Sequence, residues 1–160
     1  MLRFNSDHKF KIMQIADTQE IPAVSPDTLS LINNALDREK PDLVIFTGDQ
    51  IKGYSKKFKK DPAIIEGTID ILVEPIAKRN IPFMVTYGNH DAQCGVDNRG
   101  QYKFYAKYDN FISGNLRNAD DVGTADIQIY SSTEDKPVFE LYIIDSHGKA
   151  KDGAGYAPVD

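Results

Sequence analysis

The chain has 160 residues, of which 41% are hydrophobic and 27% are charged, and it carries a formal net charge of -5 with a pI near 5.2. This size and composition predict one folded domain, and the acidic balance argues against nonspecific binding of nucleic acid through phosphate contacts. No apolar run approaches the roughly 20 residues that cross a bilayer, so we expect no membrane insertion.

The amino terminus and the single cysteine say little about compartment. The apolar stretch over 12–16 is interrupted by Gln14 and is too short for the core of a signal peptide. Cys94 has no partner for an intramolecular disulfide, and we expect an inert thiol because no second histidine lies near it in the sequence. We expect a cytoplasmic protein, or an exported one from which a signal peptide has been removed.

The first ninety residues predict three strands separated by two helices. Ser25-Pro26 and Asp61-Pro62 each combine an N-cap residue with a proline at the first helical position, and apolar residues at helical spacing follow both pairs. Continuous apolar runs are typical of strands buried on both faces. The predicted elements are a strand over 9–17, a helix from Pro26 to the stop at Lys40-Pro41, a strand over 42–49, a helix over 62–80 and a strand over 81–87.

Strands separated by amphipathic helices predict right-handed crossovers and a parallel sheet, which makes the fold class α/β. Each predicted strand ends in polar residues: Asp17, Asp49 and the cluster from Gly88 to Asp91. Ligands of such sheets bind outside the carboxyl ends of the strands, so we expect these residues to share one edge.

The pattern changes after Asp91. An aromatic-rich stretch over 102–111 predicts a third helix, and two alternating segments over 126–131 and 138–145 predict a β-hairpin, because turn residues fill 133–137. A glycine-rich tail follows the hairpin.

Carboxylates, an amide oxygen and an imidazole suit divalent cations, and a pair of such ions can clamp both oxygens of an in-line phosphoryl displacement. The segments IADTQ, TGDQ and YGNHD resemble the first three motifs of the calcineurin-like metallophosphoesterase family. The resemblance implies a β-α-β-α-β layered unit that is half of a metallophosphoesterase α/β sandwich, with the hairpin trailing it. We expect one domain over residues 1–160, truncated at its carboxyl end.

The resemblance also implies a mechanism, which is hydrolysis of a phosphomonoester or phosphodiester by a hydroxide that bridges two divalent metal ions of the Mn, Fe, Zn or Mg type. It implies that Asp17 binds the first metal, that Asp49 bridges both and that Asn89 binds the second. His90 would protonate or stabilise the leaving oxygen, and Asp91 would orient the His90 imidazole.

Two departures from the family pattern affect the metal site. The first motif of the family is usually Asp-x-His, whereas Gln19 here offers a weak oxygen ligand that favours Mn or Mg over Zn. Tyr54 lies farther from Asp49 than the tyrosine that replaces this histidine in the purple acid phosphatase branch, so we do not expect it to be a ligand. The closing histidine motifs of the family are absent, and we expect His147 to be a loop residue and the chain to be a fragment.

An alternative is that the protein is an inactive or regulatory relative that uses the crevice as a binding module. Gln19 and the absence of the closing histidine motifs favour this alternative. A dinucleotide-binding domain is disfavoured because the turn after Asp17 has no glycine cradle, and an aspartyl-phosphate phosphatase because Gln19 stands where it needs an acid. The basic run over 56–60 is interpreted as a solvated loop.

We expect the chain alone to hydrolyse phosphate esters negligibly, because its oxygen ligands are too few for two ions. We also expect a homo-oligomer, because the apolar sides of segments 43–47 and 139–144 would lie on an exposed sheet face.

Overall fold

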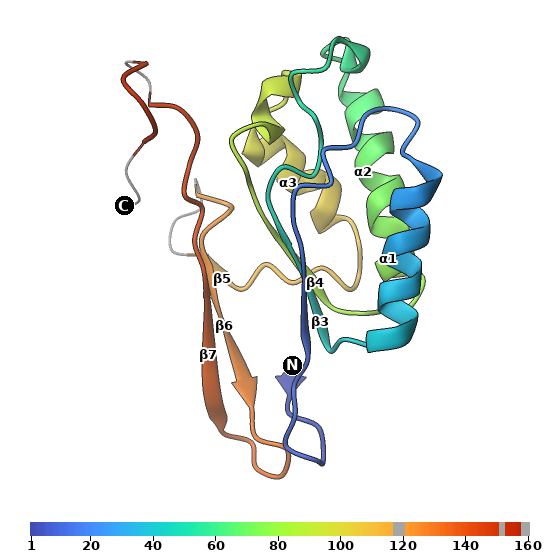
Figure 1. Cartoon of the computed structure of the whole chain (residues 1–160). Helices are drawn as coiled ribbons and strands as arrows, with labels where there is room; N and C mark the ends of the chain where they lie inside the picture. The colour runs from blue at the N-terminus through green and yellow to red at the C-terminus, as the bar shows by residue number, and fades with distance from the viewer. Residues whose placement is uncertain (117–120, 151–152, 158–160) are drawn as a thin grey trace.

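The computed structural model describes residues 1–116, 121–150 and 153–157 and confirms the predicted α/β fold. Two sheets pack face to face, and three helices cover the outer face of the first sheet (Figure 1). The elements are β1 Leu2–Arg3, β2 Ile12–Ile15, α1 Pro26–Glu39, β3 Leu43–Thr47, η1 Lys56–Phe58, α2 Pro62–Ala77, β4 Phe83–Thr86, η2 Asp91–Cys94, α3 Asn98–Ala106, β5 Asn115–Leu116, β6 Ala125–Tyr130 and β7 Pro137–Ile143.

The first sheet has the order β2-β3-β4, and all of its strands are parallel, as predicted. β3 lies in the middle, with Ile15 opposite Phe46 and Thr47 opposite Thr86. Phe46 and Val85 point towards the helices and pack in the larger core cluster. The carboxyl ends of the three strands therefore lie side by side at one edge of the sheet.

Local sequence signals set the ends of the two long helices. The Ser25 Oγ accepts a hydrogen bond from the Asp27 N–H at 3.3 Å, and the Asp61 Oδ1 accepts one from the Ala63 N–H at 2.9 Å. α1 ends where Lys40 adopts a left-handed φ of 47° and donates its N–H to the Leu36 carbonyl. α1 and α2 both begin at a proline, Pro26 and Pro62, which confirms their predicted first residues.

The second sheet contains the first strand of the described chain, β1, and the last, β7. β6 pairs antiparallel with β7, which confirms the predicted hairpin, and β1 pairs parallel with β6. β1 and β5 are two-residue strands that the sequence patterns do not predict. Ile127, Ile129 and Ile143 of this sheet pack on the inner face of the first sheet.

The expectation of an exposed apolar face over 43–47 is wrong. Leu43 is fully buried and Ile45 is 6% exposed, because the second sheet covers them. The second segment of that expectation, 139–144, does carry exposed apolar side chains, since Phe139 is 49% and Ile144 56% exposed, and Val138 before it is 54% exposed. Within the described residues β7 pairs with β6 alone. Self-association through a sheet face stays a prediction, and it now concerns β7.

The third helix differs in position from its prediction. α3 spans Asn98–Ala106 because the Asp97 side chain caps it by accepting the Gly100 N–H, whereas the aromatic residues up to Phe111 continue into a turn against Phe83. Across the described ranges, no helix is long and apolar enough to span a bilayer.

Candidate active site

The loops after β2, β3 and β4 meet at the carboxyl edge of the first sheet. Asp17 follows β2 by two residues, Asp49 follows β3 by two and Asn89 follows β4 by three. The Asp17 N–H donates to the Gly48 carbonyl at 3.1 Å, and the Gln19 N–H donates to the Asp49 carbonyl at 2.9 Å. The structure therefore brings the three predicted ligand positions to the same edge, as expected from parallel strands.

The backbone at this edge is strained. Asp17, Gln19 and Asp49 have φ values of 53°, 47° and 53°, in the left-handed region that residues with a Cβ rarely adopt. Each such residue costs on the order of 1–3 kcal/mol, and such strain gathers at functional sites where the surrounding structure imposes it. The strain lies in the two loops that carry the first two motifs.

Glycines allow two of these loops to touch. A Cβ on Gly48 would lie 2.5 Å from the Gly88 nitrogen, and Gly48 also has a φ of 100°. A Cβ on Gly88 would lie 2.0 Å from Asp49 Oδ1, so that position has no room for a side chain while Asp49 keeps its place.

The buried carboxylate of Asp91 holds the loops in this arrangement. Its Oδ2 accepts the N–H groups of Asp49 and Gly88, both at 2.8 Å, and its Oδ1 accepts the Ile51 N–H at 3.2 Å. Burial raises the pKa of Asp91 to about 6, against the opposing effect of the three backbone donors.

Asp91 therefore acts on the backbone rather than on the neighbouring imidazole, which corrects its expected role. The His90 Nδ1 lies 3.1 Å from the Gln93 Oε1, and the Tyr54 ring packs edge-on against the imidazole at 4.8 Å between centroids. Gln93 carries no motif signal in the sequence, although it lies three residues after His90 in the same turn, and Tyr54 is expected from the sequence neither as a ligand nor as a partner of His90.

Asp49 is the most buried of the predicted ligands, with 8% of its surface exposed. Its Oδ1 accepts the His90 N–H at 2.9 Å, and its Oδ2 accepts the Gln19 amide at 3.1 Å. The Gln19 Oε1 lies 3.4 Å from the Tyr54 hydroxyl, which donates to it. Gln19 thus links Asp49 to Tyr54, and its nitrogen rather than its oxygen faces the carboxylate.

Residues 10–155 match the family model described as calcineurin-like phosphoesterase. The chain belongs to the calcineurin-like phosphoesterase family. The match includes all three strand-end motifs and extends through the hairpin, so it confirms the family that the motifs indicated.

Curated relatives include plant and yeast proteins. The chain is 28% identical over 182 residues to "Probable inactive purple acid phosphatase 14" of Arabidopsis thaliana, covering 97% of this chain and 44% of that protein. It is 31% identical over 181 residues to "Phosphatase DCR2" of Saccharomyces cerevisiae, covering 99% of this chain and 30% of that protein. It is 28% identical to "Probable inactive purple acid phosphatase 29" of Arabidopsis thaliana, covering 91% of this chain and 42% of that protein. The chain thus spans less than half the length of these relatives.

The available donor atoms at the family site are mainly oxygens. Among the described residues, the side chains of Asp17 and Asn89 have no hydrogen-bonding partner, whereas both carboxylate oxygens of Asp49 have one. Two carboxylates and an amide oxygen fit a hard divalent cation. The described residues contain no group of three or more His, Cys, Asp or Glu side chains arranged to hold a metal ion. The third protein ligand would therefore be the amide oxygen of Asn89.

The segment after β7 reaches the same edge. A Cβ on Gly148 would lie 3.9 Å from the Asn89 Cα, so this loop passes beside the third motif. His147 has a left-handed φ of 61°, and its N–H donates to the Asp145 Oδ1 at 2.7 Å. Its imidazole Nδ1 lies 3.9 Å from the same oxygen. Its role as a loop residue and not a ligand stays a prediction.

Proposed function

We propose that the protein is a metal-dependent phosphoesterase that hydrolyses phosphomonoesters or phosphodiesters. The observation that carries this proposal is the arrangement of Asp17, Asp49, Asn89 and His90 at one strained edge of a parallel sheet. Strand-end loops with this donor set are suited to phosphoryl chemistry, where catalysis consists mainly of positioning and charge stabilisation. Membership of the phosphoesterase family supports the same reaction class.

In this mechanism Asp17, Asp49 and Asn89 would hold divalent cations. Gln19 would add a weak oxygen ligand only after its amide turns, because its nitrogen donates to Asp49. Bound cations would supply Lewis-acid polarisation of the phosphate and an activated water as nucleophile. Asp91 fixes the backbones of Asp49 and Gly88 and so holds the loops that carry Asp49 and Asn89. His90, held by Gln93 and Tyr54, would give a proton to the leaving oxygen through its Nε2.

The test is hydrolysis of p-nitrophenyl phosphate and bis(p-nitrophenyl) phosphate by the longest protein whose reading frame contains this chain, with and without Mn²⁺. We expect metal-dependent turnover that Asp49→Asn abolishes together with metal binding. Normal turnover in a chelator, or in Asp49→Asn, would contradict the proposal. The 160-residue chain alone should show negligible turnover, because its donors are too few for two ions.

A second candidate is an inactive or regulatory member of the family that uses this edge as a binding module. Two observations favour it: the Gln19 amide occupies an oxygen of Asp49, and two of the relatives above are named inactive. Bound metal without hydrolysis of either ester, in the same assay, would support this candidate over the phosphoesterase.

A further inference from the structure

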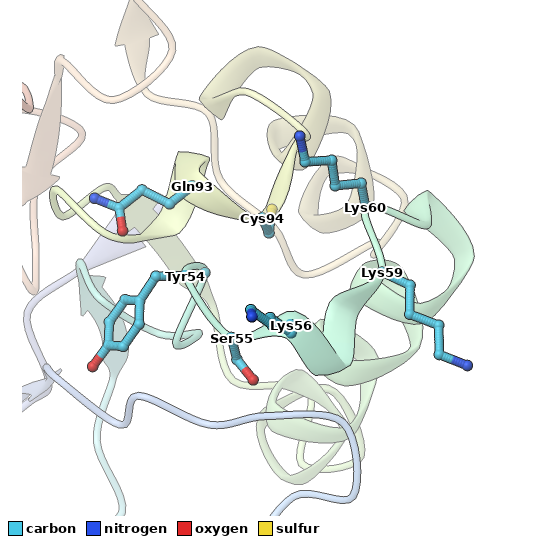
Figure 2. A pocket seen from close by; sticks show the side chains of 8 residues that line it. Tyr54, Ser55, Lys56, Lys59, Lys60, Gln93 and Cys94 are labelled. Carbon is cyan, nitrogen blue, oxygen red and sulfur yellow. The ribbon is translucent and has the colours of Figure 1, made fainter.

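A lysine-rich loop after Asp49 forms one wall of a pocket beside the candidate active site. The hollow has a volume of about 270 Å³, and we call it the lysine pocket. In Figure 2, Tyr54 and Gln93 lie on one side of the hollow, Lys59 and Lys60 lie on the other, and Cys94 lies between them. Lys56, Lys59 and Lys60 all line the hollow.

Two walls of the lysine pocket are in direct contact with the proposed acid. The Tyr54 ring packs on the His90 imidazole, and the Gln93 Oε1 lies 3.1 Å from the His90 Nδ1. A group bound in the pocket therefore lies one side chain away from a phosphate at His90. The pocket extends the active site on the side of the leaving group.

The charge of this loop is unusual for the molecule. Its lysines are exposed, and within the described residues their ammonium groups have no carboxylate partner: Lys56, Lys57, Lys59 and Lys60. Asp61, the next acid along the chain, is engaged as the cap of α2. Four lysine charges thus face the single adjacent carboxylate of Asp61 in a protein of net charge -5, and this local excess of positive charge attracts an anion.

The loop is also held in a fixed shape. Phe58 is fully buried and anchors it from within, and the Asp61 N–H donates to the Phe58 carbonyl at 2.9 Å. Lys59 and Lys60 both have a φ of 54°, so their backbone is strained, and the stem of Lys60 packs beside Gly95. A fixed loop positions the Lys60 stem at the rim of the pocket.

We propose that the lysine pocket binds a second phosphoryl group of the substrate, so that the preferred substrates are small phosphate esters that carry two phosphoryl groups. The inference rests on the proposed phosphoesterase function. Lysine ammonium groups bind phosphate as point charges, and they leave the ester itself to the cations and His90.

The first test measures binding, and it is independent of hydrolysis. The affinity of the chain for inorganic pyrophosphate is determined by calorimetry in the presence of a chelator. In Lys56→Gln/Lys60→Gln we expect affinity to fall at least about tenfold, because two contacts to a charged ligand are lost. The control Lys57→Gln/Lys103→Gln has the same change of charge but removes exposed lysines that do not line the pocket, and it should change affinity less than about twofold.

The second test measures selectivity in the same variants of the hydrolysing protein. The ratio of kcat/KM for an ester with two phosphoryl groups to that for its monophosphoryl analogue should fall in Lys56→Gln/Lys60→Gln and stay constant in the control. Equal pyrophosphate affinities of the two double variants would overturn the lysine pocket as the binding site. If Lys56→Gln/Lys60→Gln loses pyrophosphate affinity but the unsubstituted protein hydrolyses no phosphate ester, the pocket is retained as a binding site and the proposed function is rejected.

Discussion

The carboxylate of Asp91 accepts the backbone N–H of Asp49 at 2.8 Å across 42 residues of sequence. The same carboxylate binds the N–H groups of Gly88 and Ile51, so one buried side chain fixes two of the three loops that form the site. Asp91→Ala would leave these donors buried without an acceptor. We expect it to lower the free energy of unfolding by about 3 kcal/mol or more, as measured by urea denaturation.

The control for Asp91 is Asp109→Ala, which removes an exposed carboxylate and should change stability by less than about 0.5 kcal/mol. A loss under about 1 kcal/mol in Asp91→Ala would show that water or a shifted loop replaces the carboxylate.

A methyl group at Gly88 should displace Asp49. In Gly88→Ala the new Cβ would overlap with the Asp49 carboxylate, so we expect Mn²⁺ affinity to fall at least about tenfold by calorimetry. Gly67 offers a matched control, since it lies exposed in α2 with open space around it. Gly67→Ala should raise stability by about 0.5–1 kcal/mol and leave Mn²⁺ affinity unchanged. Unchanged Mn²⁺ affinity in Gly88→Ala would remove Asp49 from the ligand set.

His90 should affect turnover more than metal retention. In the longest protein whose reading frame contains this chain, we expect His90→Ala to lower kcat by about a hundredfold to ten-thousandfold, because a general acid is lost. Bound metal, measured by atomic absorption, should stay near its original content. His8→Ala is the control, because His8 is exposed at the far end of the chain. Parallel loss of metal and activity in His90→Ala would make His90 a ligand.

The pH dependence of stability should carry a contribution from Asp145. Burial raises the pKa of Asp145, although the His147 N–H and the Asn98 amide both donate to its carboxylate. The folded state then binds this proton more tightly than the unfolded state. The corresponding stability is complete below the unfolded pKa of about 4 and is lost as pH rises through the raised folded value.

Asp145→Asn has no such proton to lose. Relative to this variant, we therefore expect the wild-type free energy of unfolding to fall as pH rises from about 4 towards neutrality. The His147 imidazole and Asp121 also act on this carboxyl group, so His147→Gln is measured in parallel. Equal pH profiles of wild type and Asp145→Asn would show that Asp145 does not cause the dependence.

β7 should determine any self-association. Val138 and Ile144 are exposed apolar residues on or beside a strand that pairs on one side within the described residues. Lysine at the edge of a sheet opposes further strand pairing. We expect Val138→Lys/Ile144→Lys to shift sedimentation towards the monomer. A wild-type chain that sediments as a monomer at high concentration would contradict the expected oligomer.

Sequence patterns predicted the parts of the fold that depend on local information. The N-cap residues Ser25 and Asp61 and the apolar run of β3 identify elements whose signals lie within a few residues. β1 and β5 could not be predicted in this way, because two-residue strands exist only through pairing with β6. Their position depends on contacts between distant segments.

The candidate site shows the same division. Asp17, Asp49 and Asn89 could be placed at one edge because each follows a recognisable strand. The role of Asp91 could not be predicted, because its acceptors face backbone groups some forty residues away, and no side-chain pattern encodes them. The lysine pocket could not be predicted for a similar reason. The basic run lines a pocket only because Gln93 and Cys94, more than thirty residues later in the chain, lie opposite it.

The pairing of β1 with β6 has a consequence for the order of folding during synthesis. Leu2 lies opposite Ile129, and the Arg3 guanidinium donates to the carbonyls of Ser131 and Glu134 in the following hairpin turn. A ribosome needs on the order of ten seconds to make the segment that separates these partners. Until the hairpin has been made, Leu43 and Ile45 lack the side chains that bury them. The nascent chain therefore exposes an apolar surface that chaperones would have to shield from aggregation.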